Sequence, residues 1–264
     1  MAVLIHNRLT ELLGSDTEMT FLGFYVAAFA GYAAGTGLRL LHFNKAAKVF
    51  TWVALTCNGA LLVQLTAQSG HVPLFNTFES FVLATFILGL MGLSRPEEGK
   101  ALPDAITWVQ LMILLLLAIT LFFPKTPAPD RSSYSNVYVF FFYGFRGIAF
   151  PLMFFASAHF FQFLGSAKKA GANRETFHKG RNLLILATVF FLASEYVGIV
   201  WCQRGWGDFW MWNFNFLSST FIVLYLMLAF HIPAKGHAGE RVAAVVGGMG
   251  SVVMLGMILA RSTA

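Results

Sequence analysis

The chain has 264 residues, of which 57% are hydrophobic and only 11% are charged, and phenylalanine alone contributes 29 of them. In soluble domains roughly a quarter of the residues are charged. This composition therefore excludes a soluble domain and indicates an integral membrane protein. The formal net charge is +6. The basic residues gather between the apolar runs, where they indicate topology and attraction to anionic lipid instead of nucleic-acid binding.

Eight apolar runs follow one another along the chain, each of about twenty residues and long enough to cross ~30 Å of hydrocarbon. They predict transmembrane helices at 19–41, 48–67, 74–93, 103–123, 136–163, 181–202, 214–232 and 241–260. The first run follows a polar, amphipathic start without a basic leader or a small-residue cleavage site, so we expect a retained helix. The predicted fold class is all-α: a polytopic helical membrane protein, with residues 1–264 forming a single integral membrane domain.

The basic residues predict the orientation of these helices, because cytoplasmic loops carry an excess of lysine and arginine. The loops after the first, third, fifth and seventh spans hold twelve of them, Arg39 included, whereas the opposite side holds five. We therefore expect a multi-pass protein of the cell's inner (cytoplasmic) membrane with both termini outside. This orientation places the loops at 68–73 and 203–213 on the outer, periplasmic face, where they could form a platform.

Four of the six tryptophans fall within twelve residues, and three of them, Trp206, Trp210 and Trp212, belong to the outer loop after the sixth span. Tryptophan at a membrane surface is usually an interfacial anchor, because its ring is buried while its N–H stays near water. This density exceeds what a single anchor belt needs. Aromatic rings on such a platform would stack on a flat, apolar, partly charged ligand, and haem fits that description.

Three segments carry a resemblance to one family. The stretch WGDFWMWN at 206–213 resembles the "WGxYWxWD" core of the tryptophan-rich haem-handling proteins of cytochrome c assembly, the CcsA/ResC branch related to CcmC. The stretch GHVPLFNTFES at 70–80 is similar to the branch's "GhfPlsNlyES", and LAFH at 228–231 is similar to its "YLH". Order, spacing and predicted sidedness agree, so the likeness covers nearly the whole chain.

This resemblance implies a protein that holds haem on the outer platform and presents it to the CxxCH thiols of an apocytochrome, with a second haem site in the membrane at His231. Any enzymatic activity would be haem attachment together with a ResB-like partner chain. The chain departs from the family where WNFNFL replaces "WDPKET", and the family's two outer histidines have no counterpart. We therefore expect a divergent member that relies on a partner for the missing ligands.

Three histidines lie on the predicted inner side: His42 ends the first span, His159 lies in the fifth and His231 ends the seventh. Imidazole is a good axial ligand for haem iron, so two of them, foremost His231 and His159, could hold one non-covalent b-type haem. The alternative for helix-end histidines is the headgroup region, which we expect for His42. The outer His71 is either a substitute ligand or a residue that helps to start the third helix.

Ionisable groups inside a membrane are costly, so each is a functional candidate. Arg146 and Glu195 lie at compatible depths in the fifth and sixth spans, and we expect a structural ion pair. Alternatively, Arg146 meets a haem propionate or a quinone carbonyl and Glu195 handles protons. For Glu79 we expect hydrogen bonds to a loop backbone. The glycine-rich run at 246–251 predicts close helix packing.

Two functions follow from the sequence. The first is haem handling in cytochrome c biogenesis, with a c-type apocytochrome and a ResB-like chain as partners. The second is a membrane subunit of a respiratory or multihaem cytochrome complex for electron transport, which anchors a c-type cytochrome and binds b-type haem or quinone, or serves as a scaffold only. A transporter is a weaker third reading, since Pro151 is the one mid-span proline that would support it.

Overall fold

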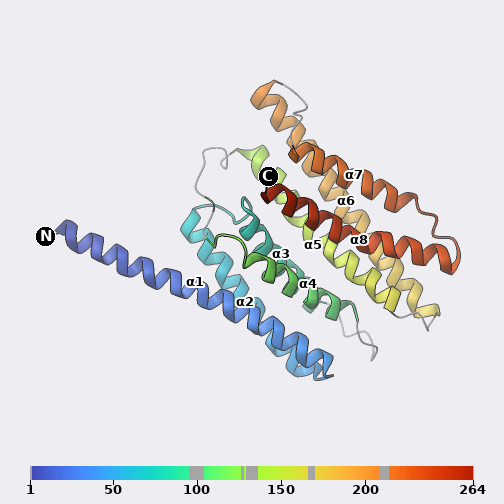
Figure 1. Ribbon diagram of the computed structural model, residues 1–264, viewed down its shortest axis with the longest axis horizontal. Coiled ribbons are helices and arrows are strands. Elements are labelled where there is room, and N and C mark those ends of the chain that lie inside the picture. Colours follow the sequence, from blue (N-terminus) through green and yellow to red (C-terminus); the bar gives the residue numbers. More distant parts are fainter. Residues whose placement is uncertain are drawn as a thin grey trace.

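The computed structural model describes residues 2–94, 104–125, 128, 136–165, 170–207 and 214–263. Within these ranges the chain forms helices and no strand, which confirms the predicted all-α class. The helices are α1 (Ala2–Leu40), α2 (Asn44–Ser69), α3 (Thr77–Leu93), α4 (Ala105–Thr120), α5 (Val137–Gly165), α6 (Ala170–Trp206), α7 (Phe214–His231) and α8 (Gly236–Thr263). Figure 1 shows them as one elongated bundle, with α1 and α2 along one side, α7 along the other and α5 between.

Each predicted span coincides with one helix, but the lengths differ. Five stretches are long and apolar enough to cross a membrane: Thr20–Leu40, Asn44–Ser69, Val137–Gly165, Arg174–Gly205 and Ala238–Ala260. The shorter apolar helices are Thr77–Leu93, Ala105–Thr120 and Phe216–His231. At 1.5 Å per residue a 16-residue helix is about 24 Å long, less than the ~30 Å hydrocarbon core.

Capping residues explain why two of these helices are short. The Asn76 side chain accepts a hydrogen bond from the Glu79 N–H at 2.7 Å, so α3 starts at Thr77, later than the predicted 74. The Asp104 side chain accepts one from the Thr107 N–H at 3.0 Å and starts α4 at Ala105. These caps satisfy backbone donors that an apolar pattern does not reveal.

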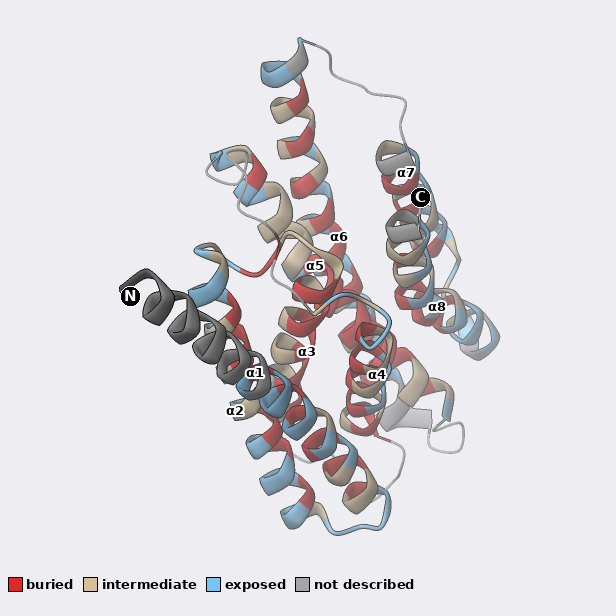
Figure 2. Cartoon of the chain, turned by 60° about the vertical axis from the view of Figure 1, so that its left-hand side comes forward, coloured by how far each residue is buried: buried red, intermediate tan, exposed pale blue. Residues whose placement is uncertain are grey.

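Large apolar side chains cover the outside of the bundle. Val63 is 70% exposed, Val49 is 61% and Val189 is 57%, and many others on the outer helices are more than 40% exposed. In Figure 2 the exposed residues follow the outward faces of the helices, while the buried ones face the centre. A soluble monomer does not carry apolar surface on this scale, so a lipid bilayer surrounds these faces.

The core of the bundle is α5. Every residue from 149 to 160 is buried, and the helix contacts α3, α4, α6 and α8. A helix that is buried all round is central to its fold. Pro151 lies inside α5 without ending it.

Glycines allow α8 and α6 to approach α5 closely. A Cβ on Gly247 would lie 2.5 Å from the Phe160 ring, and one on Gly180 would lie 3.2 Å from the same ring. A Cβ on Gly248 would lie 2.9 Å from Phe161. The prediction of close packing at 246–251 is confirmed, because the rings occupy the space that side chains would need.

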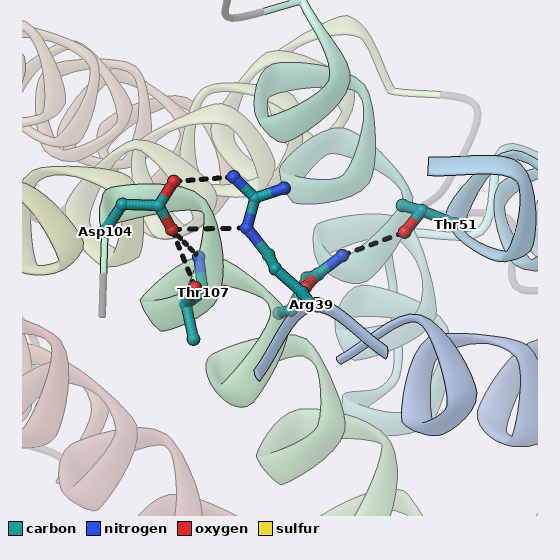
Figure 3. A network of polar contacts seen from close by, with 5 residues as sticks. Arg39, Thr51, Asp104 and Thr107 are labelled. Atoms are coloured by element: carbon teal, nitrogen blue, oxygen red, sulfur yellow. Dashed lines mark hydrogen bonds and ion pairs between the residues drawn. The ribbon is translucent and has the colours of Figure 1, made fainter. Parts of the chain in front are cut away.

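A buried polar network joins the end of α1 to the start of α4 (Figure 3). Arg39 donates from Nε to Asp104 Oδ1 at 3.2 Å and from Nη2 to Oδ2 at 2.5 Å. Both residues are about 5% exposed. A separate hydrogen bond from Gln110 Nε2 to Thr51 Oγ1, 2.8 Å long, joins α4 to α2. Arg39, counted among the loop charges from sequence, is therefore a buried partner of an aspartate.

Candidate functional site

The loop between α2 and α3 is held in place by Glu79. This carboxylate is fully buried, and its Oε2 accepts hydrogen bonds from the Phe75 and Asn76 N–H groups at 3.0 and 3.4 Å. Its Oε1 accepts the Ala128 N–H at 2.6 Å, which ties the α4–α5 connection to the same carboxylate. The expectation that Glu79 bonds a loop backbone is confirmed. Two connections far apart in sequence are thus fixed at one end of the bundle.

His71 lies in this loop and belongs to the same assembly. Its Nε2 is 3.1 Å from the Ala128 carbonyl oxygen, and its ring makes an edge contact with Phe75, with centroids 5.0 Å apart. Ser69 also bonds the His71 backbone, which supports the start of the loop. These contacts favour the role of His71 in the connection that leads into α3, one of the two alternatives predicted for it.

Behind this loop lies a cavity of about 510 Å³. Its walls come from the start of α3 and the loop before it, the connection after α4, and α5, α6, α7 and α8. Most of the lining is aromatic or aliphatic. Representative wall residues are Phe75, Phe81, Tyr143, Phe150, Ile222 and Met254. We call this the cavity end of the bundle. A concave, apolar site with few polar groups is the usual form of a small-molecule site.

Arg146 is the charged group among the described residues that line the cavity. Its Nη2 donates to Glu195 Oε1, which confirms the predicted ion pair, and also to Ser219 Oγ at 2.6 Å. The guanidinium carbon lies 4.3 Å from the Phe142 ring centroid and 5.5 Å from that of Phe191. Helices α5, α6 and α7 thus meet at one cation. Ser219 was missed from sequence, although the polar run Ser218-Ser219-Thr220 in an apolar helix is a signal.

Both hydrogen bonds that Arg146 makes to described residues use the same nitrogen. Among the described residues, Nη1 has no hydrogen-bond partner and Nε is a buried donor without one. An arginine has five N–H donors in a fixed fork, so three remain after the two that Nη2 provides. Of these, Nε is fully buried, whereas Nη1 is not, so the two Nη1 donors are the ones that a bound acceptor would use.

His231 lies at the opposite end of the bundle, exposed in the last turn of α7. Its Nδ1 is 2.7 Å from the Met227 carbonyl oxygen. A carbonyl oxygen only accepts hydrogen bonds, so Nδ1 carries the proton, and in the neutral ring Nε2 carries the lone pair. This is the form of histidine that binds a metal through Nε2 while a backbone carbonyl orients the ring.

The other two inner histidines lie in different surroundings. His159 is 1% exposed within the core of α5, with its ring 5.2 Å from that of Phe155. His42 has φ +65° and is exposed in the turn between α1 and α2, and its place in the headgroup region stays a prediction. The structure therefore does not place His159 and His231 on one surface. Among the described residues no group of three or more His, Cys, Asp or Glu side chains is arranged to hold a metal ion.

The predicted tryptophan platform lies mostly outside the described residues. Trp206 ends α6, but its side chain and the whole of Trp210 and Trp212 are not described. Trp201, one helical turn earlier, is half-buried and has its ring 6.2 Å from that of Phe142. The platform at 203–213 stays a prediction.

A scan against known protein families finds no match for this chain, and a search of curated proteins finds no relative. The resemblance to the CcsA/ResC branch therefore depends on the three sequence segments alone.

Proposed function

We propose that this protein handles haem in cytochrome c biogenesis and that His231 is an axial ligand to a non-covalent b-type haem. The observation that carries the proposal is the hydrogen bond from Nδ1 to the Met227 carbonyl on an exposed ring, which leaves the Nε2 lone pair for iron. His231 is also the residue that the family resemblance assigns to a haem site in the membrane.

The surroundings of His231 suit the rest of the haem molecule. The exposed face of α7 is an apolar stripe with spacings of four and three residues, made of Leu217, Phe221, Leu224 and Leu228, and His231 ends it. Exposed basic side chains lie at the same end of the bundle, Arg181, Lys235 and Arg241. A macrocycle would lie against apolar surface while arginine or lysine paired with its propionates. When bound, haem would supply the iron chemistry.

The α7 stripe also suits a partner helix. α7 packs against α8 and, to a lesser extent, α6, and the alternation of four and three residues is the spacing of a helix-packing seam. A ResB-like partner, or a c-type apocytochrome that receives the haem, would supply the second axial ligand there. In the proposed orientation this end faces the cytoplasm, and the loops at 68–73 and 203–213 face the periplasm.

A pyridine haemochrome assay on the purified protein tests the haem proposal. We expect b-type haem near one per chain in the wild type and a loss of tenfold or more in His231→Ala. The matched control is His178→Ala, because His178 is an exposed histidine at the same end of the bundle. Equal haem contents in the two variants, or no haem in the wild type, would contradict the proposal.

A second function, as a membrane subunit of a respiratory or multihaem cytochrome complex, is favoured by the cavity around Arg146, which lies apart from His231. Gene deletion separates the two functions. A biogenesis factor is required for c-type cytochromes to acquire haem, whereas a complex subunit copurifies with redox subunits in cells whose cytochromes mature without it.

A further inference from the structure

We propose that the cavity between α3, α5, α7 and α8 binds the head group of a neutral, lipid-soluble quinone, with Arg146 donating a hydrogen bond to one of its carbonyl oxygens. This site is separate from His231 and does not depend on the haem proposal. Three features of the cavity support it: its charge balance, its unused donors and the character of its walls.

The charge balance favours a neutral ligand. Arg146 is paired with Glu195, so the positive charge that Arg146 brings to the cavity wall is neutralised. Their side chains are 20% and 17% exposed, which means that both are largely removed from solvent. An anionic ligand such as a haem propionate would add an uncompensated negative charge beside Glu195 in an apolar bundle. A carbonyl compound adds an acceptor without adding charge.

The donors of Arg146 are suited to such an acceptor. Ser219 and Glu195 occupy Nη2, and among the described residues Nη1 has no hydrogen-bond partner. Phe142 and Phe191 pack against the guanidinium and, with its two polar partners, hold it in place. A cation fixed in this way binds a carbonyl oxygen without losing further side-chain freedom.

The walls match the two parts of a quinone. Phe75, Tyr143 and Phe150 supply aromatic rings for a flat head group, and Ile222, Met254 and Ile258 supply aliphatic surface for an isoprenoid tail. The volume of about 510 Å³ accommodates the head group and the first part of a tail. A lipid-soluble ligand reaches such a site from the bilayer that surrounds the bundle.

The test is a titration of the purified full-length protein in detergent with decylubiquinone, in which isothermal calorimetry measures the heat of binding. We expect saturable binding at one site per chain. Met254→Trp fills the cavity and should abolish binding, whereas Val252→Trp, two positions earlier on the same helix and 50% exposed, should leave it unchanged. The double variant Arg146→Gln/Glu195→Gln keeps polar groups without either charge and should weaken binding about tenfold or more.

Equal binding by the Met254→Trp and Val252→Trp variants would overturn the proposal, as would an absence of saturable binding to the wild type. Should the double variant not fold, the tryptophan pair decides the outcome. His231→Ala is expected to bind decylubiquinone as the wild type does. A loss of haem in that variant with unchanged quinone binding separates the two proposals.

Discussion

At the scale of single residues, the buried carboxylate of Asp104 has two roles, in the cap of α4 and in an ion pair with Arg39. Asp104 caps α4 through the Thr107 N–H and at the same time neutralises Arg39. A buried charge is tolerated when its partner is present and is costly when the partner is removed. The same carboxylate therefore contributes to the start of one helix and to the docking of another.

Asp104→Ala should lower the free energy of unfolding by about 3–5 kcal/mol, because it leaves Arg39 buried without a counter-charge. Denaturant titration in detergent micelles, followed by circular dichroism, measures this change. The control is Arg39→Met/Asp104→Asn, which removes both charges but keeps a side-chain acceptor at the cap. We expect the double variant to recover most of the loss. Equal destabilisation in both variants would contradict this prediction, because the double variant keeps the cap and has no unpaired charge.

At the scale of the elements, the contact between α5 and α8 depends on glycine. Phe160 lies between Gly180 of α6 and Gly247 of α8, so its ring has no room to move away from a new side chain. This explains how the bundle holds a large aromatic residue where three helices come close together. Gly256, further along α8, has nothing within 4 Å of its Cβ position.

Gly247→Ala should therefore destabilise the protein by about 1–3 kcal/mol through overpacking against Phe160. Gly256→Ala should be neutral or stabilise it by up to about 1 kcal/mol, because alanine favours a helix over glycine and the site is open. Thermal unfolding of the two variants in the same detergent compares them directly. A similar shift in both would contradict the packing argument.

At the scale of the whole molecule, the helices place the cavity and His231 at opposite ends of the bundle. The cavity end carries the α2–α3 loop with Val72, and the opposite end carries the α7–α8 turn with Lys235. Both residues are exposed. The charge distribution predicts that the first end is periplasmic and the second cytoplasmic.

Single cysteines at these positions test that orientation, in a background with Cys57→Ala and Cys202→Ala. In intact spheroplasts a membrane-impermeant maleimide should label Val72→Cys, and it should label Lys235→Cys only after permeabilisation. The reverse pattern would invert the orientation, and labelling of both cysteines in intact cells would contradict a membrane-spanning arrangement.

By itself the sequence determined the class of protein and the positions of its helices. Long apolar runs have few alternatives to a transmembrane helix, because backbone groups in lipid must be satisfied within the segment. The same reasoning paired Arg146 with Glu195, since two isolated charges at similar depth cannot remain unpaired in hydrocarbon. For Glu79, a place near the predicted outer surface led to the expectation of hydrogen bonds to a loop backbone.

Only the tertiary structure decided which faces of these helices meet. It buried Arg39 against Asp104. From the sequence Arg39 looks like a loop charge, because its partner lies 65 positions away in the chain. The tertiary structure also buried His159 while leaving His231 exposed, and it formed a cavity lined by Arg146 from five helices and two connections. These outcomes depend on helix rotation, and apolar runs that are hydrophobic on every side carry no period from which a rotation can be read.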